Sequence, residues 1–163
     1  MATASLIQYL GTTDAVTGAQ LGVSPSDRLK VETFITSAAI TKGQVVALDV
    51  SKMATDATGG LTSITVLPAD FDSAPVQKVV VGVAAESQSV VGGLIKVIVR
   101  GPAQSVPVVA ATAVGAALIL DPAGVAGSAD IQTAGSVQDA FGIALTSTAG
   151  AGTVTAYVYN KGI

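Results

Sequence analysis

From Arg28 onward, short runs of apolar and β-branched residues are separated by Gly, Pro, Ser and Asp. Runs of this length, bounded by turn-forming residues, are typical of β-strands rather than of amphipathic helices. The pattern predicts strands around residues 29–35, 45–48, 61–67, 79–84 and 94–99, and a pair of buried strands within 106–120. We therefore expect an all-β fold, a compact β-barrel or β-sandwich.

The same order of blocks occurs twice along the chain. Residues 79–101 resemble residues 139–160, and the segment that begins at Lys42 resembles the segment that begins at Val114. The matched positions are Gly43 with Gly115, Asp49 with Asp121, Gly82 with Gly142, Ala84 with Ala144 and, after a one-residue deletion, Gly93 with Gly152. Because Ala, Gly and Val are frequent here, chance similarity is the alternative. The preserved order favours two similar β units, at about 38–101 and 112–162.

Residues 1–27 lack the strand pattern and lie outside the repeat. They contain short apolar clusters separated by Gly, Thr and Ser, and they end at the turn-prone segment 24–27. We interpret residues 1–27 as an extended N-terminal arm and residues 28–163 as the β domain, with a frayed terminus as the alternative. The apolar residues of the arm are expected to contact a partner: Leu6, Ile7, Tyr9 and Leu10.

The composition restricts the possible functions. Half of the residues are hydrophobic, but 12% are charged, where about 25% is usual. This favours a chain whose apolar surface is partly covered by other subunits, although Ser, Thr and Gly can also supply polarity. The absence of His and Cys excludes Ser-His-Asp and Cys-His catalysis and the usual zinc sites. We expect no enzyme and no cofactor.

The charge and hydropathy patterns bear on the possible partners. The net charge is −3, and the eight basic residues are spread along the chain, so we expect no nucleic-acid binding. The N-terminus has no basic segment ahead of an apolar one, and the apolar stretches at 79–99 and 106–120 are interrupted or short. We expect no signal peptide and no membrane span.

Few residues suggest chemistry. Asp70 and Asp72 lie in one loop, but a Ca²⁺ site needs more oxygen ligands. Asp49 and Asp121 form a conceivable glycosidase-like pair, although side-chain capping of the turn after each strand is the simpler interpretation. Ser51 and Lys52 are too ordinary a pair to indicate a dyad. Gly150 to Thr153 leads into a strand-like segment, which indicates a hairpin turn and not a dinucleotide loop.

Tyr157 and Tyr159 alternate with Val158 and therefore share one face of the last strand. Tyrosines so placed favour a subunit interface, since each ring has an apolar body and a polar tip. Partial burial at a sheet edge is the alternative.

The segments ITKGQVVALD, VVGVAAESQSVVGGLIKVIVRG, VGAALILDPAG and AFGIALTSTAGAGTVTAYVY resemble the DUF2190-like cement proteins that decorate tailed-phage capsids. The resemblance covers roughly residues 38–160; the segments 51–75 and 102–111 fit it less closely. It implies a structural virion protein, a homotrimer on the outer capsid surface of a bacteriophage. Such a capsid decoration protein binds the major capsid protein and gives capsid stabilisation by cementing neighbouring subunits. The alternative is another phage structural or surface β module, such as a tail tube, fibre or adhesin domain.

Overall fold

A computed structural model describes residues 29–51, 64–71, 79–134 and 139–159. The expected arm, residues 1–27, lies outside this part of the chain. The described residues form nine strands joined in one mixed sheet. The strands are β1 (Lys30–Thr36), β2 (Val45–Leu48), β3 (Thr65–Pro68), β4 (Val80–Ala84), β5 (Leu94–Val108), β6 (Ala117–Leu120), β7 (Ala129–Ile131), β8 (Gly142–Ala144) and β9 (Gly152–Tyr159). None of the described residues belongs to a helix long and apolar enough to span a bilayer.

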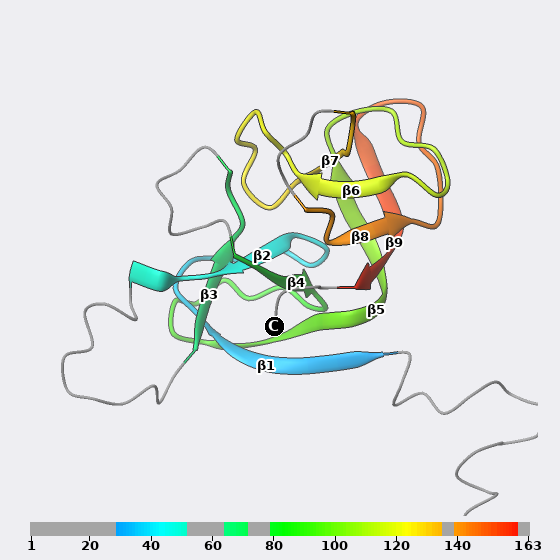
Figure 1. Cartoon of the computed structure of the whole chain (residues 1–163). Helices are drawn as coiled ribbons and strands as arrows, with labels where there is room; N and C mark the ends of the chain where they lie inside the picture. The colour runs from blue at the N-terminus through cyan, green and yellow to red at the C-terminus, as the bar shows by residue number, and fades with distance from the viewer. Residues whose placement is uncertain (1–28, 52–63, 72–78, 135–138, 160–163) are drawn as a thin grey trace, which may run out of the picture.

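The sheet closes on itself twice. In the first ring, β1 pairs in parallel with β3, and antiparallel pairs then link β3 to β2, β2 to β4, β4 to β5, and β5 back to β1. In the second ring, β5 pairs in parallel with β7, and antiparallel pairs link β7 to β6, β6 to β8, β8 to β9, and β9 back to β5. Figure 1 shows the first ring in the lower half of the view and the second ring above it.

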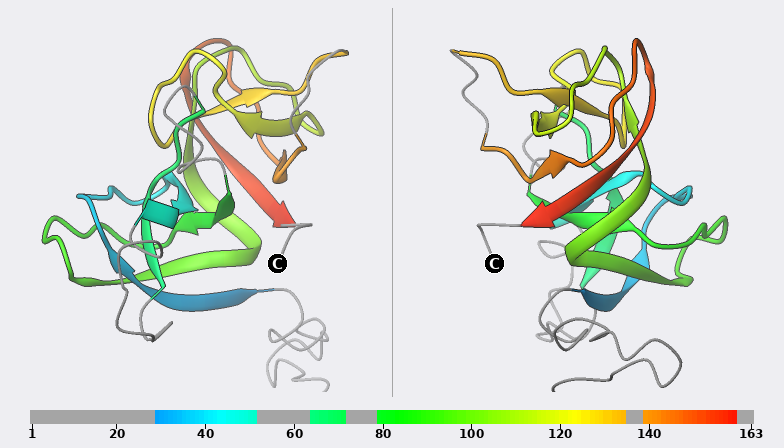
Figure 2. Two further views of the ribbon diagram at one scale, coloured as in Figure 1. Left: turned by 60° about the vertical axis from the view of Figure 1, so that its left-hand side comes forward. Right: turned by 90° about the vertical axis from the view of Figure 1, so that its right-hand side faces the viewer.

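Strand β5 belongs to both rings. Its residues 94–100 pair with β1, and its residues 100–108 pair with β9. The strand bends where it passes from one ring to the other: Gly101 has φ +115°, and Ser105 has φ +59° at a register shift between Ala103 and Val106. Both views of Figure 2 show β5 rising from the lower ring with β9 beside it.

The two rings have the same pairing scheme, strand for strand. In the first ring Val46 pairs with Gly82, and in the second Leu118 pairs with Gly142. An isolated bridge between Ile40 and Gln88 has its counterpart between Thr112 and Thr148. The prediction of an all-β, barrel-like fold built from two similar β units is therefore confirmed. The second ring begins within β5, so the correspondence includes residues 102–108, which the sequence comparison left between the units.

Each ring encloses apolar side chains, and residues on the outside of the first ring pack into the core of the second. The core of the first ring contains Phe34, Ile40, Val46, Val66, Val81, Ala84, Ile95 and Val97. The core of the second ring includes Leu118, Leu120, Phe141, Val154 and Val158, and it also includes Val45, Ala47 and Val83 from the first ring. Strand β2 is thus buried on both faces. Val46 points into its own ring, and Val45 and Ala47 pack against the second.

Candidate interaction surface

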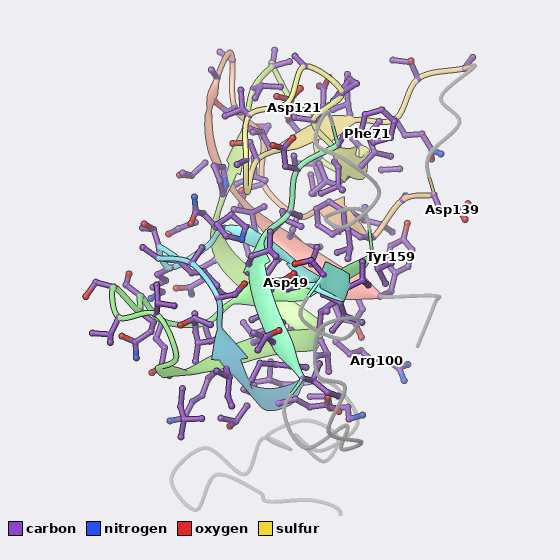
Figure 3. All side chains as sticks on the ribbon, turned by 90° about the vertical axis from the view of Figure 1, so that its left-hand side faces the viewer. Asp49, Phe71, Arg100, Asp121, Asp139 and Tyr159 are labelled. Carbon is purple, nitrogen blue, oxygen red and sulfur yellow. The ribbon has the colours of Figure 1, made fainter. Side chains whose placement is uncertain are left out.

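The two buried aspartates, Asp49 and Asp121, act in turns. Asp121 accepts hydrogen bonds from the backbone N–H groups of Ala123 (2.9 Å) and Val125 (3.0 Å). Asp49 accepts from the N–H of Ser51 at 3.1 Å and from the Ser51 hydroxyl. Figure 3 shows Asp121 high in the second ring and Asp49 in the first, so the carboxylates do not converge. The capping interpretation is confirmed, and the interpretation as a glycosidase-like pair is wrong.

The structure describes only some of the other candidates for chemistry. Asp70 is half-buried, whereas Asp72 and Lys52 lie outside the described residues. Gly150 and its neighbours form the turn that enters β9, as predicted. Within residues 29–51, 64–71, 79–134 and 139–159, no group of three or more acidic side chains could hold a metal ion.

The junction between the rings depends on close backbone contact. The N–H of Val45 donates to the carbonyl of Gly127 (2.9 Å), and the N–H of Gly127 donates to the carbonyl of Ala69 (2.6 Å). Gly43, at φ +88°, lies so near β5 that a Cβ there would be 2.1 Å from the carbonyl oxygen of Ser105. Its counterpart Gly115 has φ +86° and no such neighbour within 4 Å. Both glycines lie in a turn that leads into a strand, as predicted. Only at Gly43 does the absence of a side chain also allow the backbone of the other ring to approach closely.

Several large apolar side chains remain exposed on the described surface. The most exposed ones lie at hairpin and loop tips: Val90, Val91 and Leu94 around the β4–β5 turn, and Val114 ahead of β6. Val125 lies in the loop between β6 and β7, and the others lie on strands or directly beside them: Leu29, Val31, Ile64, Val79, Ile143 and Leu145. Val90, Val91 and Leu94 adjoin one another at one turn, and a group of exposed apolar side chains of this kind favours a contact with another protein.

Tyr157 and Tyr159 lie half-buried on the outer face of β9 (Figure 3 labels Tyr159). Tyr157 is opposite Ile143 on β8 and Pro102 on β5, and Ile143 is opposite Ala117 on β6. Residues directly opposite one another in antiparallel strands share a face. Ala117, Ile143, Tyr157 and Pro102 therefore form a continuous apolar line across four strands, which we call the outer row.

The sequence placed both tyrosines on one face of the last strand, but it did not indicate their neighbours in the outer row. Ile143 and Pro102 are distant in sequence from Tyr157, and the strand pairings bring them together. Two signals could have placed β8 beside β9: the equivalence of the two β units and the hairpin turn predicted at Gly150 to Thr153. The other candidate contact residues, Leu6, Ile7, Tyr9 and Leu10, lie outside the described residues.

No protein-family model matches the sequence, and no curated protein matches it. A solved structure does match: the head fiber gp8.5 N base in bacteriophage phi29. The TM-score is 0.51 at 17% sequence identity, and the likeness covers 83% of this chain and 98% of that chain. At this identity the likeness establishes a shared fold.

Proposed function

We propose that the chain is a structural virion protein that binds the outer surface of a phage head and cements neighbouring subunits of the major capsid protein. The observation that carries this proposal is the fold likeness, because it covers nearly the whole of a head fiber base. The resemblance of residues 38–160 to DUF2190-like cement proteins led to the expectation of cementing, but no family model matches the chain. The fold likeness is therefore the main support for a place on a phage head.

The surface of the described chain supports a role in assembly. Val90, Val91 and Leu94 are each more than 60% exposed and lie together at one turn. Tyr157 and Tyr159, the expected subunit-interface residues, lie half-buried on the outer face of β9. A chain with 12% charged residues has few charges with which to keep such surfaces in water. Contact with capsid subunits and with further copies of the chain would cover them.

Cementing would act through mass action. A protein that binds only the assembled lattice stabilises it by an amount that grows with the logarithm of its free concentration. A homotrimer would strengthen the attachment further, since three weak contacts on one rigid body bind as a multivalent unit. Neither step needs a cofactor, and both need a rigid scaffold, which two rings with a shared strand provide.

The test is reconstitution on heads that lack the protein, prepared from the phage whose genome encodes it. The purified full chain should co-sediment with these heads and raise the temperature at which they release their DNA. Heads of an unrelated phage serve as the control. Equal heat stability with and without saturating protein would refute the cementing role, and absence of co-sedimentation would refute head binding.

A second candidate is the base of a head fiber, and a specific observation favours it, since the matched structure is itself a fiber base. In that case the domain would attach an appendage and would leave the stability of the head unchanged. Negative-stain microscopy of reconstituted heads separates the two possibilities. Projecting fibers without a rise in the DNA-release temperature would favour the fiber base.

We further propose that the N-terminal arm makes part of the head contact. Its apolar residues Leu6, Ile7, Tyr9 and Leu10 lie outside the two β units in sequence. Deletion of residues 1–20 should therefore weaken co-sedimentation with heads more than it lowers the free energy of unfolding of the β domain. Unchanged affinity of the truncated chain for heads would contradict this assignment.

A further inference from the structure

The outer row of the second ring has a counterpart in the first ring, rung for rung. Val45 pairs with Val83, Val83 with Ile98, and Ile98 with Val31. These residues occupy β2, β4, β5 and β1, as Ala117, Ile143, Tyr157 and Pro102 occupy β6, β8, β9 and β5. We call the first-ring line the junction row. Both rows are apolar and both point out of their own ring.

The two rows differ in what covers them. Val45 and Val83 are fully buried in the core of the second ring, and Ile98 packs against the same core. In the outer row, Ile143 is 37% exposed, Tyr157 is half-buried and Pro102 is exposed. Three residues of the junction row are thus covered by the neighbouring β ring of the same chain, and Val31 at its end is 42% exposed. The outer row faces solvent along more of its length. Within this chain, a β ring therefore already packs against an apolar row of the same kind as the outer row.

The charges beside the outer row are complementary to one another. Tyr159 pairs with Arg100 on one side, and on the other its N–H donates to the carbonyl of Phe141, close to Asp139. Figure 3 shows Tyr159 between Arg100 and Asp139. Both charged residues are exposed, and the only ion pair among the described residues joins Lys30 to Glu32. A surface with a cation at one end and an anion at the other suits a second copy of itself.

We propose that the outer row is the contact through which the chain binds a second copy of itself. Tyr157 and Ile143 form its apolar centre, and Arg100 of one copy meets Asp139 of the other at its edge. In a cyclic trimer this ion pair forms once in each contact, and in a two-fold dimer it forms twice. This inference names the surface through which the oligomer of the proposed function would form, and to that extent it rests on the proposed function.

The test measures self-association of the full chain by sedimentation equilibrium. Ile143→Lys places a charge in the centre of the contact and should raise the dissociation constant about tenfold or more. Val114→Lys is the matched control, because Val114 is 66% exposed on a loop of the same ring, outside the row. Circular dichroism verifies that both variants are folded. A monomeric wild-type chain, or equal association of the two variants, would overturn the proposal.

A charge exchange provides evidence that does not depend on the fold of the Ile143 variant. Arg100→Asp and Asp139→Arg should each weaken self-association, because each brings like charges together across the contact. The double variant restores opposite charges and should recover most of the lost affinity. Additive weakening in the double variant would show that the two residues do not meet across the contact.

Head binding is measured separately, so the two proposals can fail separately. If Ile143→Lys is monomeric and wild-type oligomers do not bind heads, the proposed function fails and this inference stands. If Ile143→Lys associates like the wild type but no longer binds heads, the outer row contacts the capsid. That outcome would overturn the inference and leave the proposed function in place.

Discussion

Substitution of Gly43 by alanine, compared with the same change at Gly115, measures how strongly the junction holds the two rings together. The glycines occupy equivalent turns and have nearly equal φ angles, +88° and +86°. Alanine in this left-handed region costs about 1–2 kcal/mol at either position. At Gly115 the new Cβ meets no heavy atom within 4 Å, so that backbone penalty is the whole expected loss.

At Gly43 the new Cβ would also lie 2.1 Å from the carbonyl oxygen of Ser105. Ser105 cannot easily retreat, because it is held at φ +59° between the β5–β9 rungs at Ala103 and Val106. Forced overpacking of this kind adds about 1–3 kcal/mol. Gly43→Ala should therefore lower the free energy of unfolding by about 2–5 kcal/mol, against about 1–2 kcal/mol for Gly115→Ala.

The assay is equilibrium unfolding in guanidinium chloride, followed by circular dichroism at a protein concentration where both variants have the same oligomeric state. Equal loss of stability in the two variants would refute the reasoning, since it would mean that the contact between Gly43 and Ser105 places no constraint on the junction. A changed denaturant dependence for Gly43→Ala alone would indicate that the rings then unfold separately.

Three further predictions use the same equivalences, each measured by equilibrium unfolding under dilute, non-associating conditions. Gly82→Ala should lower the free energy of unfolding more than Gly142→Ala. The added Cβ would lie 2.1 Å from the Ile98 carbonyl oxygen at Gly82, but 2.8 Å from the Tyr157 carbonyl oxygen at Gly142. The reverse order would contradict the closer approach of the strands at Gly82. Asp121→Ala leaves the N–H groups of Ala123 and Val125 without their acceptor and should cost about 1–3 kcal/mol, whereas a loss near zero would argue against the capping role. Val83→Ala shortens a buried side chain at the junction and should lower the free energy of unfolding by about 2 kcal/mol. Ile143→Ala at the equivalent exposed position should lower it by less. Equal losses of stability would mean that the outer row is already covered.

The fold class could be predicted because alternating apolar runs and glycine turns are local signals. Gly43 and Gly115 mark turns that require positive φ, and such a requirement is visible in the sequence. The same is true of Asp49 and Asp121, since a buried aspartate at a strand end can satisfy the backbone of the next turn.

The continuity of β5 could not be predicted. Gly101, Pro102 and Pro107 indicate an interruption, because proline removes a ladder donor and is usually found on edge strands. Here they lie within the strand, since over residues 102–107 β5 pairs with β9 alone and its other side forms no ladder. Strand β7 was not predicted, for a different reason. Its sequence, Ala-Asp-Ile, is too short to show a strand pattern, and its parallel pairing with β5 is a contact between distant segments.

The exposure of the outer row can be explained by the way in which two similar β units pack against each other within one chain. When similar units pack in series, each covers the contact face of the one before it, and the last unit keeps an open face. Repeat proteins that act alone usually end this series with a polar terminal face. Among the described residues, the second ring presents Ile143, Tyr157 and Pro102 on its outer face, flanked by one cation and one anion. A second copy of the chain that packs against this face, as proposed above, would cover it in the way that the second ring covers most of the junction row.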